Sequence, residues 1–213
     1  MIKAYLFDFD GTLVDSMPTF ASCMLRILDE NKIPYEPDII KVLTPLGLEG
    51  CVKHMISMGL PMTPEQTALK IKEYLMDGYL YHILPKENVV SVLKELKAQG
   101  AKLNILTASP HITLDPCLKR NNMYELFDNV WSCDDFATTK ADPEIYKQVA
   151  ERLGVPVEEV LFLDDNIHAD MTAKKAGMQV CGVYDDSSKD YVAQMQAEND
   201  YYIFNFSELL SIQ

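Results

Sequence analysis

The sequence predicts an α/β fold in which helices cover both faces of a parallel β-sheet. Three observations lead to this prediction. Short, almost wholly apolar segments alternate with amphipathic helical segments, as parallel sheets require. Polar residues gather where the apolar segments end, at the sheet edge where functional sites of such folds lie. A strand-poor helical stretch interrupts the alternation after the first apolar segment.

The first strand is expected in IKAYLFDFD, which is apolar until it reaches Asp8 and Asp10. The next part of the chain has a helical pattern, with helices expected at Pro18–Asn31, Pro37–Leu43, Leu48–Ser57 and Pro64–Tyr81. The segments between them, NKIPYEP, TPLG and MGLPMTP, contain turn-forming residues. We therefore expect residues 16–81 to form a small all-helical cap domain above the carboxyl ends of the strands. Residues 1–15 and 82–213 are expected to form the α/β core domain.

Strands and helices alternate after Pro85. Helices are expected in NVVSVLKELKAQG, PHITLDPCLKRNN, ADPEIYKQVAERLG, HADMTAKKAG and SELLSI, and strands in AKLNILTAS, NVWSC, EVLFLDD, MQVCGVY and YYIFNF. The best-marked helix has Asp142 at its N-cap, Pro143 at its first position and Gly154 just past its end. Pro116 argues against one unbroken helix in its segment. Together these elements predict a Rossmann-like sheet.

Composition limits the possible functions. Apolar residues make up 48% of the 213 residues, which is enough for a packed core. The net charge of −13 disfavours nucleic acid and anionic membranes as partners. The five cysteines are scattered and are expected to be free thiols of a reducing compartment. We find no signal peptide pattern and no apolar run near the roughly 20 residues of a membrane span, so we expect a cytoplasmic protein.

Four separate segments bring polar side chains to the ends of the expected strands. These side chains are Asp8, Asp10, Thr107, Ser109, Lys140, Asp164 and Asp165. A single aspartate after a strand is usually a turn or capping residue. Four carboxylates at one sheet edge, however, need a cation among them. Oxygen ligands without a nearby His or Cys favour Mg²⁺ over zinc.

The motifs DFDGTLVDS, LTAS, TKADPEIY and FLDDN resemble, in this order, the four motifs of the haloacid dehalogenase-like superfamily. The resemblance covers nearly the whole chain. It is closest to the phosphatases with a small helical cap after the first motif, the phosphoglycolate phosphatase and β-phosphoglucomutase type. The first motif is highly specific, whereas the second is weak by itself. The resemblance implies a Mg²⁺-dependent phosphatase that hydrolyses a small phosphorylated metabolite through an aspartyl-phosphate.

The resemblance also implies a role for each matching residue. Asp8 matches the nucleophile that attacks phosphorus, and Asp10 matches the general acid/base. Thr107 matches the hydroxyl that binds the phosphoryl oxygens. Lys140 matches the lysine that screens the nucleophile and stabilises the transition state.

The implied ligand contacts follow from the same match. The metal ligands are Asp8, the backbone carbonyl of Asp10, and Asp165, with Asp164 beside them. Phosphate-binding backbone is implied around Phe9 and Asp10, and further substrate contacts at Thr107, Ala108 and Lys140. Gly47 falls where the specificity loop of the cap is expected, although an ordinary turn glycine is the other interpretation.

The chain departs from the family pattern at two motifs. Ala141 follows Lys140 where the family usually has proline, and Ala169 stands where it often has another acid. Asp170, one residue further, either supports the metal site or is an exposed helix residue. His111 either approaches the substrate or lies on the surface.

Several functions stay open. A sugar phosphomutase shares the four motifs and differs in whether water or a second hydroxyl accepts the phosphoryl group. A phosphoaspartate signalling domain needs no helical insert, and a catalytically silent member is expected to lack Asp8 or Asp10. Asp10 also argues against a dehalogenase, which needs no protonated alcohol leaving group. The substrate and the oligomeric state are not predicted.

Overall fold

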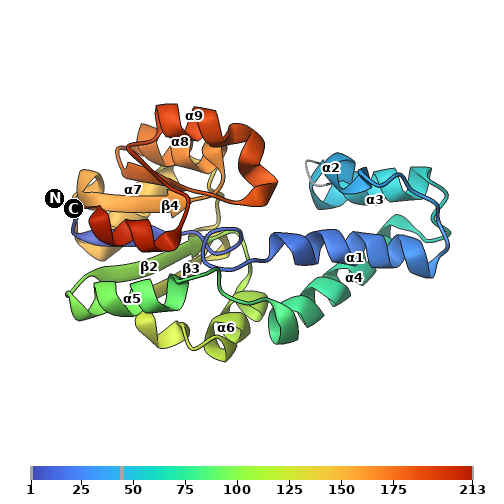
Figure 1. Cartoon of the computed structure of the whole chain (residues 1–213), viewed down its shortest axis with the longest axis horizontal. Helices are drawn as coiled ribbons and strands as arrows, with labels where there is room; N and C mark the ends of the chain where they lie inside the picture. Colours follow the sequence, from blue (N-terminus) through green and yellow to red (C-terminus); the bar gives the residue numbers. More distant parts are fainter. Residues whose placement is uncertain (1, 44–45, 213) are drawn as a thin grey trace. The chain divides into compact units, whose positions relative to one another are not determined.

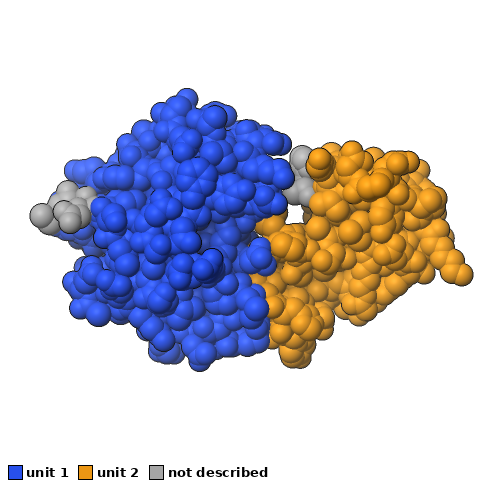
Figure 2. Space-filling model, viewed as in Figure 1, with its two compact units in different colours: residues 1–15, 84–213 blue, residues 16–83 orange. Residues whose placement is uncertain are grey.

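The chain divides into two compact units in the computed structural model, which describes residues 2–43 and 46–212. Unit 1 comprises residues 1–15 and 84–213, and unit 2 comprises residues 16–83 (Figure 2). Within the described ranges, none of the helices has both the length and the apolar character needed to cross a membrane.

Unit 1 is built on a parallel sheet with the strand order β3-β2-β1-β4-β5-β6 in the described chain (Figure 1). The strands are β1 (Ala4–Phe7), β2 (Lys102–Thr107), β3 (Asn129–Ser132), β4 (Val160–Asp164), β5 (Gln179–Val183) and β6 (Tyr201–Ile203). Phe7 pairs with Ile105 of β2 and Leu163 of β4, so these three strands end at one edge. The predicted α/β fold with a parallel sheet is confirmed.

Helices cover both faces of this sheet, with α8 on one side and α5 on the other (Figure 1). The longer helices are α5 (Val89–Ala98), α6 (His111–Arg120), α7 (Pro143–Leu153), α8 (Ile167–Ala176) and α9 (Val192–Glu198). Short 3₁₀ segments are η3 (Tyr124–Leu126), η4 (Cys133–Phe136), η5 (Val157–Glu159), η6 (Asp186–Tyr191) and η7 (Phe206–Ser211). The SELLSI segment thus forms a 3₁₀ helix, and α9 is an element that the sequence analysis missed.

The two faces of β1 explain why its sequence is apolar without alternation. Ala4 and Leu6 are fully buried in a core cluster with Tyr146 of α7 and Ala173 of α8. Phe7 has its ring 6.0 Å from that of Phe206 in η7. Because successive side chains of a strand point to opposite faces, a strand covered on both sides needs apolar residues throughout.

Two helix predictions met different outcomes. Asp142 caps α7 by accepting a hydrogen bond from the Glu144 amide, and Gly154 ends the helix with a φ of 65°, as predicted. The expected break at Pro116 is wrong, because Pro116 lies inside α6. Proline removes one helical hydrogen bond, to the carbonyl four residues earlier. That carbonyl belongs to Ile112, an exposed residue.

Unit 2 is helical and has a core of its own. Its helices are α1 (Met17–Glu30), α2 (Ile39–Leu43), α3 (Gly47–Ser57) and α4 (Pro64–Asp77), followed by the π-helical turn η2 (Gly78–His82). Ile27, Met55 and Ile71 belong to one buried cluster. Thr44 and Pro45 of the expected TPLG turn lie outside the described residues. Gly47 is the first residue of α3 rather than part of a loop.

Candidate active site

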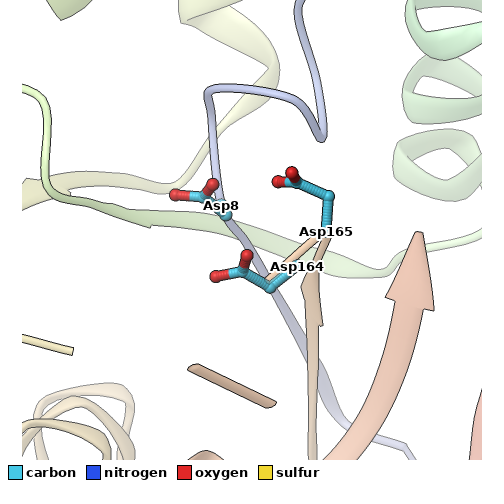
Figure 3. A group of neighbouring side chains, drawn as sticks. All are labelled: Asp8, Asp164 and Asp165. Carbon is cyan, nitrogen blue, oxygen red and sulfur yellow. The ribbon is translucent and has the colours of Figure 1, made fainter. Parts of the chain in front are cut away.

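Three buried aspartates converge at the carboxyl ends of β1 and β4. Asp8 directly follows β1, Asp164 is the last residue of β4, and Asp165 comes next. Each offers a carboxylate oxygen within 4.8 Å of the others, and Figure 3 shows the three side chains around one region. The register of the two strands causes this, because Phe7 pairs with Leu163, which brings the residues that follow side by side.

Lys140 places one positive charge against this group. Its Nζ lies 2.6 Å from Oδ1 of Asp8 and 2.7 Å from Oδ2 of Asp164, and its side chain is 15% exposed. The hydroxyl of Tyr146 donates to the Lys140 carbonyl, which fixes the backbone before α7. Burial lowers the pKa of Lys140, but the charges of Asp164 and Asp8 outweigh burial and hold the pKa well above its usual value. The lysine is therefore charged at neutral pH.

Three buried carboxyl groups share this one lysine, and two of them have raised pKa values. Burial raises the pKa of Asp164, Lys140 lowers it and Asp8 raises it, with a net result of about 7. Burial, together with the charges of Asp164 and Asp8, also raises the pKa of Asp165 well above its usual value. A divalent cation would supply the missing charge, and a donor set of carboxylate oxygens fits Mg²⁺. The residues that are present therefore fit a magnesium ion.

The loop after Asp10 packs directly against Asp165. Gly11 has a φ of +76°, and a Cβ at this position would lie 2.6 Å from Oδ2 of Asp165. Thr12 donates from its hydroxyl to Oδ1 of Asp165 at 3.3 Å. Only glycine fits here, since any side chain would meet the carboxylate. The sequence analysis did not single out Gly11 or Thr12, although both lie within the first motif.

Asp10 is linked to the second motif. Its Oδ2 accepts a hydrogen bond from the hydroxyl of Ser109. Thr107, the last residue of β2, is 1% exposed, and its hydroxyl oxygen accepts from the Ser109 amide at 3.1 Å. The side chain of Asp10 lies outside the group of described carboxylates that could share one metal ion. The described carboxylates that could share one metal ion are therefore those of Asp8, Asp164 and Asp165.

Three other predicted site residues, Phe9, Ala108 and Gly47, lie outside the group of buried carboxylates. The Phe9 side chain is fully buried, and its carbonyl accepts from the amides of Leu13 and Val14, so Phe9 shapes the loop through its backbone. Ala108 is exposed beside Thr107. Gly47 belongs to unit 2.

His111 bridges two carboxylates on neighbouring elements. Its Nδ1 lies 2.8 Å from Oδ1 of Asp115 in α6, and its Nε2 lies 2.9 Å from Oδ2 of Asp135 in η4. Hydrogen bonds to Asp115 and Asp135 raise the pKa of His111. Both ring nitrogens are thus used within the protein, which favours a structural role over contact with a substrate.

Asp170 is completely buried, so its interpretation as an exposed helix residue is wrong. Its Oδ2 accepts from Nδ2 of Asn199 at 2.5 Å. In the described chain, neither Oδ1 of Asp170 nor Oδ1 of Asn199 has a hydrogen-bond partner. Burial raises the pKa of Asp170 well above its usual value, and the charge of Asp164 raises it further.

Asp170→Asn is expected to stabilise the metal-free protein at pH 7 by on the order of 1–3 kcal/mol. An asparagine can donate to Oδ1 of Asn199, accept from its Nδ2, and bury no charge. Because folding raises the pKa of Asp170, this carboxyl destabilises the folded protein only at pH values above its unfolded-state pKa of about 3.9. The gain should therefore shrink as the pH falls toward 4. Urea unfolding of both proteins with EDTA at pH 7 and near pH 4 measures it. A destabilised variant at pH 7 would contradict this account of Asp170.

Comparisons with known proteins agree with this site. The family model described as haloacid dehalogenase-like hydrolase matches residues 5–183. Pyrophosphatase PpaX of Bacillus velezensis is 30% identical over 99% of this chain and 96% of its own length. Phosphoglycolate phosphatase of Psychrobacter arcticus is 28% identical, covering 84% of this chain and 79% of that protein.

Solved structures share the fold. The crystal structure of a candidate β-phosphoglucomutase from Thermotoga maritima has a TM-score of 0.86 and 25% identity, and covers 99% of this chain and 98% of its own. The hydrolase YfnB of Bacillus subtilis, described as bound to magnesium, has a TM-score of 0.81 and 20% identity, covering 99% of this chain and 98% of its own. On the family match and the PpaX relative together, the chain belongs to the haloacid dehalogenase-like hydrolases.

Proposed function

We propose that this protein is a Mg²⁺-dependent phosphatase that hydrolyses a small phosphomonoester through an aspartyl-phosphate on Asp8. The observation that carries the proposal is the buried group of Asp8, Asp164 and Asp165 around Lys140. The named phosphatases among its relatives support the same reaction class. Unit 2 is the candidate cap domain.

Asp8 is the proposed nucleophile. One of its oxygens attacks phosphorus, and the bond between phosphorus and the substrate's ester oxygen breaks. Lys140 screens the negative charge of Asp8 from the incoming phosphoryl group. Mg²⁺, held by Asp8, Asp165 and the Asp10 carbonyl with Asp164 beside them, would neutralise charge on the phosphoryl oxygens.

Asp10 is the proposed acid and base. It donates a proton to the departing alcohol and then takes a proton from the water that attacks the aspartyl-phosphate. That second attack breaks the bond between phosphorus and Asp8 and releases inorganic phosphate. The hydrogen bond from Ser109 holds the Asp10 carboxyl in place between these steps. Thr107, at the end of β2, is the proposed hydroxyl donor to the phosphoryl oxygens.

Phosphate release from a panel of small phosphomonoesters and pyrophosphate, with Mg²⁺ and then with EDTA, tests this function. We expect release with Mg²⁺, its loss on chelation, and recovery when Mg²⁺ is restored. Mg²⁺ at about 100 times its Kd should also stabilise the protein by about 2.7 kcal/mol. Phosphate release that continues in EDTA would contradict the proposed metal dependence.

A sugar phosphomutase is the second candidate, favoured by the likeness to the Thermotoga maritima structure. The same residues would form the aspartyl-phosphate, but a second sugar hydroxyl would accept the phosphoryl group in place of water. Conversion of a hexose 1-phosphate into its 6-phosphate, followed by NMR, separates the two reactions. Isomer conversion without phosphate release would favour the mutase.

A further inference from the structure

Lys86 lies in the segment that returns to unit 1 and makes three contacts through its Nζ. The ammonium donates to the carbonyl of Gly11 and, at 2.7 Å, to the carbonyl of Tyr184. It also lies 2.9 Å from Oδ2 of Asp185. An ammonium group has three N–H donors, so these contacts use all of them. The arrangement ties the loop after Asp10 to the end of β5.

The backbone of Lys86 is joined to the same loop. Its amide donates to the carbonyl of Leu13 at 3.0 Å, and the amide of Asp15 donates to the carbonyl of Leu84 at 3.0 Å. The side chain of Lys86 is 19% exposed. Both the backbone and the side chain of Lys86 are therefore fixed by contacts within unit 1. The side chain of an exposed lysine usually moves freely in solvent, but that of Lys86 has one defined position.

Asp185 provides a matching buried anion. It is 4% exposed, and its Oδ1 accepts from the amide and the hydroxyl of Ser187. Burial raises the pKa of Asp185, but hydrogen bonds from Ser187 and Lys86 outweigh burial and hold the pKa below its usual value. The carboxylate is thus charged and fixed. It forms an ion pair with the Lys86 ammonium.

The Gly11 end of this chain of contacts meets Asp165. Gly11 approaches the Asp165 carboxylate so closely that no Cβ fits, and Thr12 donates to it. Partners that orient a metal ligand typically change metal affinity 10- to 100-fold when they are mutated. Lys86 contacts the Gly11 carbonyl, and Gly11 in turn lies against Asp165.

We propose that Lys86 is a positioning residue that holds the Gly11–Thr12 segment against Asp165 and so sets the orientation of this carboxylate for the metal ion. The inference rests on the proposed function, in which Asp165 is a Mg²⁺ ligand. It adds a residue outside the four motifs to the machinery of the site. Asp185 balances the charge of Lys86. Lys86 therefore affects metal binding by orienting the Asp165 carboxylate, and not by adding positive charge to the site.

The test compares Mg²⁺ binding to wild type and Lys86→Met by isothermal titration calorimetry, in the absence of substrate. We expect Kd to rise 10- to 100-fold in the variant, and Lys86→Arg to recover part of the loss because it keeps the charge and the donors. Lys3→Met is the matched control. Lys3 forms an ion pair with Glu159 before β1, at the other edge of the sheet, and its loss should leave Kd unchanged within twofold.

A double variant separates positioning from charge balance. Lys86→Met leaves Asp185 buried without its lysine, so some loss of stability is expected from that cause alone. Lys86→Met/Asp185→Asn removes the unpaired charge and should recover thermal stability, while the weak Mg²⁺ binding should persist. Full recovery of Mg²⁺ affinity in the double variant would overturn the proposal. A Kd for Lys86→Met within twofold of the wild-type value would do so as well.

A metal-free readout distinguishes this inference from the proposed function. In ¹H–¹⁵N NMR spectra, the amide signals of Gly11 and Thr12 should shift in Lys86→Met and stay in place in Lys3→Met. Wild type that fails to bind Mg²⁺ would refute the metal site and the stated role of Lys86 with it. Wild type that binds Mg²⁺ while Lys86→Met leaves both Kd and these amide signals unchanged would refute the role of Lys86 alone.

Discussion

Asp8→Asn is expected to lower the rate of phosphate release by on the order of 10⁶-fold, the loss in kcat that follows removal of the nucleophile in another covalent catalyst. The substitution keeps the size and shape of the side chain but removes the charged oxygen that we propose attacks phosphorus. It also removes one of three buried carboxylates, while the amide oxygen can still accept from Lys140. The folded protein should therefore be at least as stable as wild type at pH 7, so that lost activity cannot come from unfolding.

Steady-state rates with the best substrate of the panel, together with thermal unfolding, measure both effects. Asp15→Asn is the matched control, since it makes the same chemical change at an exposed position seven residues later. Mass spectrometry of enzyme quenched during turnover should find a phosphoryl group on wild type and none on Asp8→Asn. Activity within tenfold of wild type would show that another group is the nucleophile.

The sequence was sufficient to predict the carboxylate group because the physics behind it is local. An apolar strand buried on both faces ends abruptly at Asp8, and a second one ends at Asp164. Parallel strands that end at one edge must bring such residues together, and the pairing of Phe7 with Leu163 does so. Lys140 was predictable from its place before a well-capped helix, and Ala141 in place of proline did not displace it.

The burial of Asp170 could also have been predicted from the sequence, although the sequence analysis left open whether Asp170 supports the metal site or is exposed. Ile167, Asp170 and Ala173 are spaced by three along α8, and all three are buried. The helical period therefore places Asp170 on the apolar face. This spacing is sufficient to predict that Asp170 is buried rather than exposed.

Lys86 could not have been found in this way. Its partners Gly11 and Asp185 lie 75 and 99 positions away in the sequence, and no periodic pattern or spacing connects them. The contacts depend on the path by which the chain returns from unit 2 and on where β5 ends. Helix α9 was missed for a different reason: of its seven residues, Met195 alone is buried, so the segment has almost no apolar period.

Lys140→Met is expected to cost 3–5 kcal/mol of stability in the metal-free protein at pH 8 and to reduce activity 10²- to 10³-fold. Asp8 and Asp164 would lose their shared cation at 2.6 and 2.7 Å, and two buried carboxylates would face each other unscreened. The loss of stability should grow as the pH rises through about 7, the pKa of Asp164 in wild type, and should shrink below it, because a protonated Asp164 no longer needs the charge of Lys140. In wild type, folding raises the pKa of Lys140, so its charged form contributes fully to stability below the unfolded-state pKa of about 10.4. Deprotonation of this lysine is therefore not expected to reduce stability near neutral pH.

Urea unfolding at pH 5 and pH 8, with EDTA or with saturating Mg²⁺, tests whether Lys140 stabilises the protein through charge or through packing. Lys147→Met is the control, because Lys147 is an exposed lysine of α7 paired with Glu144, and its removal should change stability by less than about 0.5 kcal/mol. If Lys140 offsets negative charge, Mg²⁺ should restore part of the stability of Lys140→Met, since a cation among the same carboxylates replaces part of what the ammonium supplied. Activity should stay low, because the ion cannot screen the attacking oxygen from the position of the lysine. A loss of stability that is the same at both pH values and is unaffected by Mg²⁺ would mean that Lys140 acts through packing rather than charge.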